Sequence, residues 1–164
     1  MDADVTRHGP EGALLAALND LIAQWTSLTR QQEVARDAGL TIDAGDIQPL
    51  YTLGRGGPRR ASALADDLRQ TRPTMSKQLA RLEAAGLIAR TPDPADGRAS
   101  IVSLTDAGAR VYTQLVEQGL LMIRTALHDW DAAERADFAA HTTRFVAAVG
   151  GSPASAPSSD SPPD

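Results

Sequence analysis

A cluster of polar side chains in the middle of the chain has the residue types that contact nucleic acid. Thr74 and Ser76 carry hydroxyls and Lys77 carries a long cation, all within one stretch that is expected to be helical. Hydroxyls near the beginning of a helix can meet phosphate oxygens or base edges, and a cation can reach deeper into the major groove. Arg72 shares this helix face and Arg81 flanks it. These five residues are candidate DNA contacts, and the alternative is a solvated helix face.

A second candidate contact lies in a polar segment further along the chain. Arg98 follows Pro92 to Gly97, a stretch expected to form the long polar tip of a hairpin between two short β-prone runs. Arginine is a good phosphate ligand and also fits a narrow minor groove, so Arg98 at such a tip suits either contact. Asp96, two residues away, could hold it in place. The alternative is a structural ion pair of Arg98 with Asp93 or Asp96.

The distribution of charge favours the same region. The whole chain carries a formal net charge of −5, which read as one number argues weakly against nucleic acid. Between Arg55 and Arg98, however, nine basic residues stand against five acidic ones. A basic middle between acidic flanks is typical of a module that faces phosphate on a scaffold that repels DNA elsewhere.

Hydrophobic periodicity and capping residues predict the elements that position these side chains. Thr71 is expected to cap the helix that carries the candidate contacts, and Met75, Leu79 and Leu82 are expected to face its core side. The expected order begins with a helix over 12–38, a second helix capped by Thr41 or Asp43 and a turn at 54–58. Two short helices over 60–68 and 72–85 and the hairpin follow. The chain then forms a long helix capped at 104–106 and a last helix that begins at the capping pattern at 131–134.

The stretch from Ala61 to Gly108 carries a series of short motifs in a fixed order. These are Leu64, Ala65 and Leu68 in the supporting helix, Thr74, Ser76 and Lys77 in the next helix, Leu82, Glu83, Gly86, Leu87, Ile88 and Arg90 at its exit, Asp96 and Arg98 in the hairpin, and Leu104, Thr105 and Gly108 after it. In this order they resemble the DNA-binding lobe of the MarR family. The resemblance implies a winged helix-turn-helix in which Asp96 braces the wing while Arg98 contacts DNA.

The expected fold is mainly α with a small β-hairpin, namely a winged helix-turn-helix lobe and a helical dimerisation region. Residues 11–149 form the MarR-like domain, with the lobe over 43–104 and dimerisation helices over 11–38 and 105–149. Residues 1–10 are expected to be a flexible N-terminus. Residues 150–164 are rich in proline, serine and aspartate and are expected to be a disordered tail.

The function that these features predict is sequence-specific binding of double-stranded DNA by a transcriptional regulator. The resemblance implies a ligand-responsive repressor that acts as a homodimer on a pseudo-palindromic operator. In the family a small-molecule pocket often lies between the dimerisation helices and the lobe, so a small aromatic or phenolic effector is expected to meet Trp25, Leu28, Tyr51 and Trp130. The alternative is a winged-helix sensor or protein-binding module that has lost DNA recognition.

Several other classes of function are disfavoured. The chain has no cysteine, which excludes disulfides, thiolate nucleophiles, thiolate zinc sites and thiol redox switches. Its three histidines are scattered, and no catalytic or nucleotide-binding motif is present, so we expect no enzyme activity, no metal and no cofactor. The N-terminus is polar, and no apolar run approaches the roughly 18 residues of a membrane span. The expected location is the cytoplasm.

Overall fold

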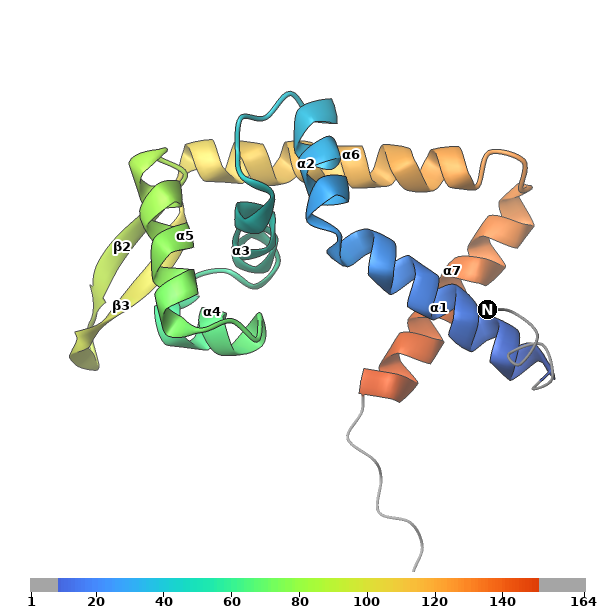
Figure 1. Cartoon of the computed structure of the whole chain (residues 1–164), viewed down its shortest axis with the longest axis horizontal. Coiled ribbons are helices and arrows are strands. Elements are labelled where there is room, and N and C mark those ends of the chain that lie inside the picture. Colours follow the sequence, from blue (N-terminus) through green and yellow to red (C-terminus); the bar gives the residue numbers. More distant parts are fainter. Residues whose placement is uncertain (1–8, 151–164) are drawn as a thin grey trace, which may run out of the picture. The chain divides into compact units, whose positions relative to one another are not determined.

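The computed structural model describes residues 9–150, and residues 1–8 and 151–164 lie outside the described part. The elements in chain order are α1 (Gly9–Thr26), α2 (Leu28–Asp37), α3 (Ala44–Gly56), β1 (Arg59–Arg60), α4 (Ala61–Asp67), α5 (Arg72–Ala84), β2 (Ile88–Asp93), β3 (Asp96–Leu104), α6 (Asp106–Ala126) and α7 (Ala132–Gly150) (Figure 1). The expectation of a flexible N-terminus and a disordered tail falls on the undescribed residues, except that Gly9, Pro10 and Gly150 are helical. None of the helices between residues 9 and 150 is long and apolar enough to cross a bilayer.

The chain divides into two compact units, whose described parts are residues 9–121 and 122–150. The first unit has one hydrophobic core, which the helices share with the sheet. Its buried members are Ala35, Ile47, Leu50, Leu53, Leu64, Ala65, Met75, Leu79, Leu82, Leu87, Ile88, Val102 and Leu115. The second unit comprises the end of α6 and α7, where Asp131 and Glu134 form the expected reciprocal cap and Trp130 packs edge-on against Phe138.

The prediction of a single helix over residues 12–38 is wrong, because the helix is interrupted at Ser27, between α1 and α2. Ser27 has an extended backbone (φ −65°, ψ 123°) and its Oγ accepts a hydrogen bond from the backbone N–H of Arg30 at 3.5 Å. A serine side chain competes with the helical backbone for hydrogen bonds and so favours a cap over a helix interior. The break lets α2 pack on α3 and bury Ala35 in the core of the first unit.

The sheet has three strands in the order β1-β3-β2, all antiparallel, whereas the sequence predicted only a hairpin. The additional strand, β1, consists of Arg59 and Arg60, which lie opposite Val102 and Ile101 of β3. Two residues are too few for a strand pattern, and their pairing depends on a partner about 40 residues away. The turn expected over 54–58 is correspondingly shorter, because α3 continues to Gly56.

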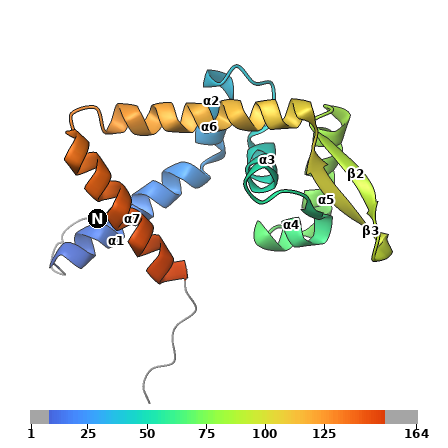
Figure 2. The same ribbon diagram turned by 180° about the vertical axis from the view of Figure 1, so that it is seen from behind.

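The long polar tip expected for the hairpin is also wrong. Asp93 pairs with Asp96, so the turn contains only Pro94 and Ala95. A register irregularity between Pro92 and Asp93 and a hydrogen bond from the backbone N–H of Ala95 to the Asp93 carboxylate, at 2.8 Å, accompany this tight turn. From behind, the β2–β3 hairpin projects beside α5 (Figure 2).

Candidate nucleic-acid interface

The helix-turn-helix is formed by α4 and α5, which are joined by a tight connection. Arg69 in this connection has a positive φ of 51°, a conformation that reverses the chain direction at a local cost. Thr71 caps α5 as predicted, because its Oγ1 accepts a hydrogen bond from the backbone N–H of Thr74 at 3.3 Å. The two threonine hydroxyls also lie 2.8 Å apart, so the side chain of Thr74 is turned toward the cap.

The two faces of α5 separate as its sequence predicts. Met75, Leu79 and Leu82 are buried in the core, together with the side chain of Gln78. The candidate contacts on this helix are all exposed, namely Arg72, Thr74, Ser76, Lys77 and Arg81. The recognition face therefore lies at the surface, and the apolar side chains hold the helix to the lobe.

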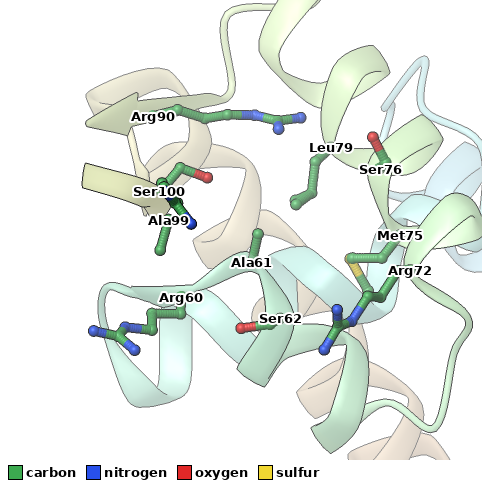
Figure 3. A pocket seen from close by; sticks show the side chains of 11 residues that line it. Arg60, Ala61, Ser62, Arg72, Met75, Ser76, Leu79, Arg90, Ala99 and Ser100 are labelled. Carbon is green, nitrogen blue, oxygen red and sulfur yellow. The ribbon is translucent and has the colours of Figure 1, made fainter. Parts of the chain in front are cut away.

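A cavity of about 340 Å³ is lined by α5, the hairpin, β1 and the start of α4 (Figure 3). Its lining combines arginine, serine and apolar side chains, and none of the lining residues is acidic. The members are Arg60, Ala61, Ser62, Arg72, Met75, Ser76, Leu79, Arg90, Arg98, Ala99 and Ser100. The structure thus brings together three of the candidate residues, Arg72, Ser76 and Arg98, around one cationic hollow.

The four arginines around this cavity differ in their partners. Arg60 pairs with the buried carboxylate of Asp93, and Arg90 lies 3.1 Å from Glu83. Among the described residues, neither Arg72 nor Arg98 forms an ion pair. These two guanidinium groups are therefore the ones in the cavity wall whose charge is not already balanced by a neighbour.

At the tip of the hairpin, two aspartates divide the bracing role that the sequence assigned to Asp96. Asp96 accepts a hydrogen bond from the backbone N–H of Arg98 at 3.1 Å, which shapes the turn. The ion pair considered as the alternative role of Arg98 is absent from the described residues. Asp93 instead holds Arg60, and its pKa lies below the usual range because of the hydrogen bond from Ala95 and the pairing with Arg60. Neither the hydrogen bond between Asp93 and Ala95 nor the ion pair between Asp93 and Arg60 was predicted from the sequence.

Arg81 faces carboxylates that the sequence did not connect with it. Its Nε and Nη2 atoms donate to the two carboxylate oxygens of Asp46 at 3.0 and 2.6 Å, and Nε also lies 3.0 Å from Asp43. Asp43 and Asp46 belong to the cap and first turn of α3. Among the seven residues predicted to contact DNA, Arg81 is the one for which the described part of the chain shows an ion pair, formed with Asp46 and Asp43.

The four residues expected to line an effector pocket are in separate surroundings. Trp25 and Leu28 are mostly exposed. Tyr51 is half-buried, donates a hydrogen bond to the carbonyl oxygen of Leu115 at 2.8 Å and packs edge-on against Tyr112. Trp130 belongs to the second unit. None of the four lines the cavity beside the hairpin or a second one of about 390 Å³ between α2 and the end of α5.

Sequence comparison connects this arrangement with known proteins. A sequence model of the MarR family matches residues 39–99, from the loop before α3 into β3. Over these residues the chain is similar to the MarR family. It is 34% identical over 89 residues to the uncharacterized HTH-type transcriptional regulator YxaD of Bacillus subtilis, and 31% identical over 93 residues to the HTH-type transcriptional regulator MT0903.1 of Mycobacterium tuberculosis. These matches cover 54% and 57% of this chain and 62% and 64% of the relatives.

Solved structures of a MarR family protein and of another transcriptional regulator share the fold. A MarR family protein from Bacillus stearothermophilus is similar with a TM-score of 0.73 at 18% identity, over 85% of this chain and 94% of that protein. The transcriptional regulator Tm0710 from Thermotoga maritima gives a TM-score of 0.63 at 24% identity, over 84% and 94%. The prediction of a mainly helical MarR-like winged helix-turn-helix is therefore confirmed. The relatives YxaD and MT0903.1 are both described as HTH-type transcriptional regulators.

Within residues 9–150, no group of three or more histidine, aspartate or glutamate side chains is placed to hold a metal ion. His128 and His141 are exposed, whereas His8 lies outside the described residues.

Proposed function

We propose that this chain is a dimeric regulator of transcription that binds double-stranded DNA through α5 and the β2–β3 hairpin. The observation that carries the proposal is the cavity wall between them, where Arg72 and Arg98 form no ion pair within residues 9–150 and no lining residue is acidic. Unpaired cations on such a surface attract phosphate and release counterions from DNA when they bind. The relatives YxaD and MT0903.1 are described as HTH-type transcriptional regulators, which supports the proposal.

Each contact element has a separate task in this proposal. Helix α5 enters the major groove with Ser76 and Lys77 toward base edges, while Arg72 and Thr74 near its N-terminus meet phosphate. The hairpin acts as the wing, and Arg98 contacts phosphate or a narrow minor groove. Asp96 contributes indirectly by shaping the backbone turn that carries Arg98.

The dimer accounts for apolar side chains that a single chain leaves in water. Their exposed fractions lie between 37 and 69%, well above those of core residues. They are Leu14, Leu15, Leu21, Ile22, Trp25, Leu28, Leu120, Leu121, Ile123, Trp130, Phe138, Phe145, Val146 and Val149. Apolar surface of this extent marks an interface, and a twofold dimer would set two α5 helices into major grooves roughly 34 Å apart. The operator would then be pseudo-palindromic.

The mode of regulation is part of the same proposal. A cytoplasmic dimer seated on a promoter excludes polymerase, so we propose repression. The chain has no cysteine for thiol redox sensing, so we propose that its signal is a small aromatic or phenolic molecule that binds non-covalently.

The test is selection of bound DNA by the full purified chain from a pool of genomic fragments. We expect enrichment of a pseudo-palindromic sequence, and loss of binding in the double variant Arg72→Ala/Arg98→Ala. Arg110→Ala is the matched control, because Arg110 is exposed on α6 away from the cavity lining. Selection that enriches no sequence would overturn the proposal in favour of a sensor or protein-binding module without DNA recognition.

A further inference from the structure

Arg81 occupies an unusual place on the recognition helix. Thr74, Lys77 and Arg81 follow one another at helical spacing and share one side of α5. The first two present their polar ends at the surface, but the guanidinium of Arg81 is held by both carboxylate oxygens of Asp46. Asp46 is 3% exposed, so the bond joins the surface of α5 to a buried carboxylate in α3. A bidentate arginine–carboxylate pair fixes orientation as well as distance.

A second polar contact lies one turn earlier on the same helix. Gln78 is buried, and its Nε2 donates a hydrogen bond to the carbonyl oxygen of Gly45 at 2.8 Å. Gly45 and Asp46 are neighbours in the first turn of α3. The side chains of Gln78 and Arg81 therefore both form hydrogen bonds with the first turn of α3, from two points along α5.

Apart from these two contacts and the ion pair between Glu83 and Arg90, α5 is held to the lobe by contacts of a different kind. Met75, Leu79 and Leu82 bury apolar surface, which stabilises packing but has little directional preference. Directional hydrogen bonds to a buried carboxylate and a backbone carbonyl resist rotation and sliding of the helix. The pKa of Arg81 is raised above its ordinary value, chiefly by the hydrogen bond to Asp46.

We propose that Arg81 and Gln78 are positioning residues that set the rotation of α5 about its axis and thereby the base specificity of DNA recognition. The inference rests on the proposed DNA-binding function. Arg81 acts through Asp46 and not by touching DNA. Rotation of α5 by a fraction of a turn moves Ser76 and Lys77 away from the base edges, while phosphate contacts by the wing are retained.

The variants Asp46→Asn and Arg81→Gln separate positioning from direct contact. If Arg81 positions the helix, each variant lowers the ratio of operator to random-DNA affinity at least tenfold and changes affinity for random DNA less than threefold. If Arg81 contacts phosphate, Asp46→Asn frees its charge and strengthens binding to both DNAs, which overturns the inference. Asp66→Asn, at an exposed aspartate of α4, controls for the loss of one carboxylate.

Gln78→Met adds an uncharged test, because it removes the hydrogen bond to Gly45 at nearly constant side-chain length. Hydrogen exchange of the α5 amides in the DNA-free chain provides a readout that does not depend on the operator. Faster exchange over residues 72–84 in Asp46→Asn and Gln78→Met, with α6 unchanged, is the expected result. If the α5 amides of the variants exchange at the wild-type rate, the positioning inference is wrong. This result does not depend on whether the wild-type chain binds DNA, so it is distinct from a failure of the proposed function. If the wild-type chain binds a specific site and all three variants keep the same specificity, the positioning inference is wrong while the proposed DNA-binding function stands.

Discussion

Arg60 of β1 and Asp93 of β2 form an ion pair between the two outer strands of the sheet. The pair links the strand that follows α3 to the hairpin tip that carries Arg98. Because the Asp93 carboxylate also accepts the N–H of Ala95, one buried group shapes the turn and anchors it to the lobe. The ion pair thereby anchors the hairpin to the rest of the lobe.

The first prediction concerns the pH dependence of this anchor. The pKa of Asp93 is depressed by the N–H of Ala95 and by Arg60, so its ionised form stabilises the fold. That contribution is complete above the usual aspartate pKa of about 4 and is lost as the pH falls through the lower pKa of the folded chain. Asp93→Asn should therefore lower the melting temperature at pH 7 and approach wild type near pH 3. Asp66→Asn should match wild type throughout, and a constant deficit of Asp93→Asn from pH 7 to 3 would contradict the argument.

The second prediction concerns Tyr51, which connects α3 to α6. Its hydroxyl donates to the carbonyl oxygen of Leu115, and Tyr51→Phe removes that bond while keeping the ring. We expect a loss of about 1 kcal/mol in the free energy of unfolding, measured by urea denaturation. Tyr112→Phe is the matched control because that ring packs on Tyr51 without a corresponding hydrogen bond among the described residues. Equal losses in the two variants would show that the hydroxyl of Tyr51 contributes nothing particular.

The local features of the lobe could be predicted from the sequence. The cap at Thr71, the apolar spacing of Met75, Leu79 and Leu82, and the cap at Thr105 are all encoded within a few residues of the structure they form. Local encoding of this kind is readable from periodicity and capping chemistry. The mainly helical class with a small hairpin and the exposed face of α5 followed from these signals, whereas the winged helix-turn-helix was implied by the resemblance to the MarR family.

The contacts that could not be predicted join residues far apart in the chain. Arg81 and Asp46 are separated by 35 residues and Arg60 and Asp93 by 33, and no local pattern reveals which of several aspartates each arginine selects. The same reason hides β1, whose two residues become a strand only through pairing with β3. Ser27 was missed because the apolar spacing continues across it, although a serine was the available signal.

The third prediction compares two glycines of α6. A Cβ added at Gly108 would lie 1.9 Å from the carbonyl oxygen of Leu87, a backbone atom that also accepts the N–H of Thr105. Gly108→Ala should therefore destabilise the fold by about 3 kcal/mol, because the strand entry and the helix would have to separate. At Gly119 the nearest atom is the Tyr51 hydroxyl at 3.5 Å, an ordinary contact.

Gly119→Ala should accordingly stabilise the chain by roughly 0.5 to 1 kcal/mol through helix propensity. Urea denaturation of both variants tests the pair. Similar effects of the two substitutions would show that the close approach at Gly108 is relaxed in solution.

The fourth prediction addresses the dimer. Light scattering of the full chain at micromolar concentration should give twice the 17.3 kDa of one chain. Ile22→Glu places a charge among the exposed apolar side chains of α1 and should shift the mass toward the monomer, since burial of an unpaired carboxylate is costly. Gln24→Glu adds the same charge at an exposed polar position of α1 and serves as the control. A wild-type mass near 17.3 kDa would remove the twofold operator from the proposal.

The last prediction separates the wing from the recognition helix. Arg98 lines the cavity at the hairpin and has no ion-pair partner in the described part of the chain. Arg98→Ala should therefore weaken binding to operator and random DNA together and lower the log–log salt slope by up to about one unit per protomer. Lys77 is exposed on α5. If its side chain hydrogen-bonds to a base edge, Lys77→Ala should chiefly reduce the difference in binding free energy between operator and random DNA, by roughly 1 to 3 kcal/mol. Both variants should melt near wild type because both side chains are exposed. Binding by Arg98→Ala that equals wild type across a salt series would mean that the hairpin is not a DNA-contacting wing, and the sensor-module alternative would then be favoured.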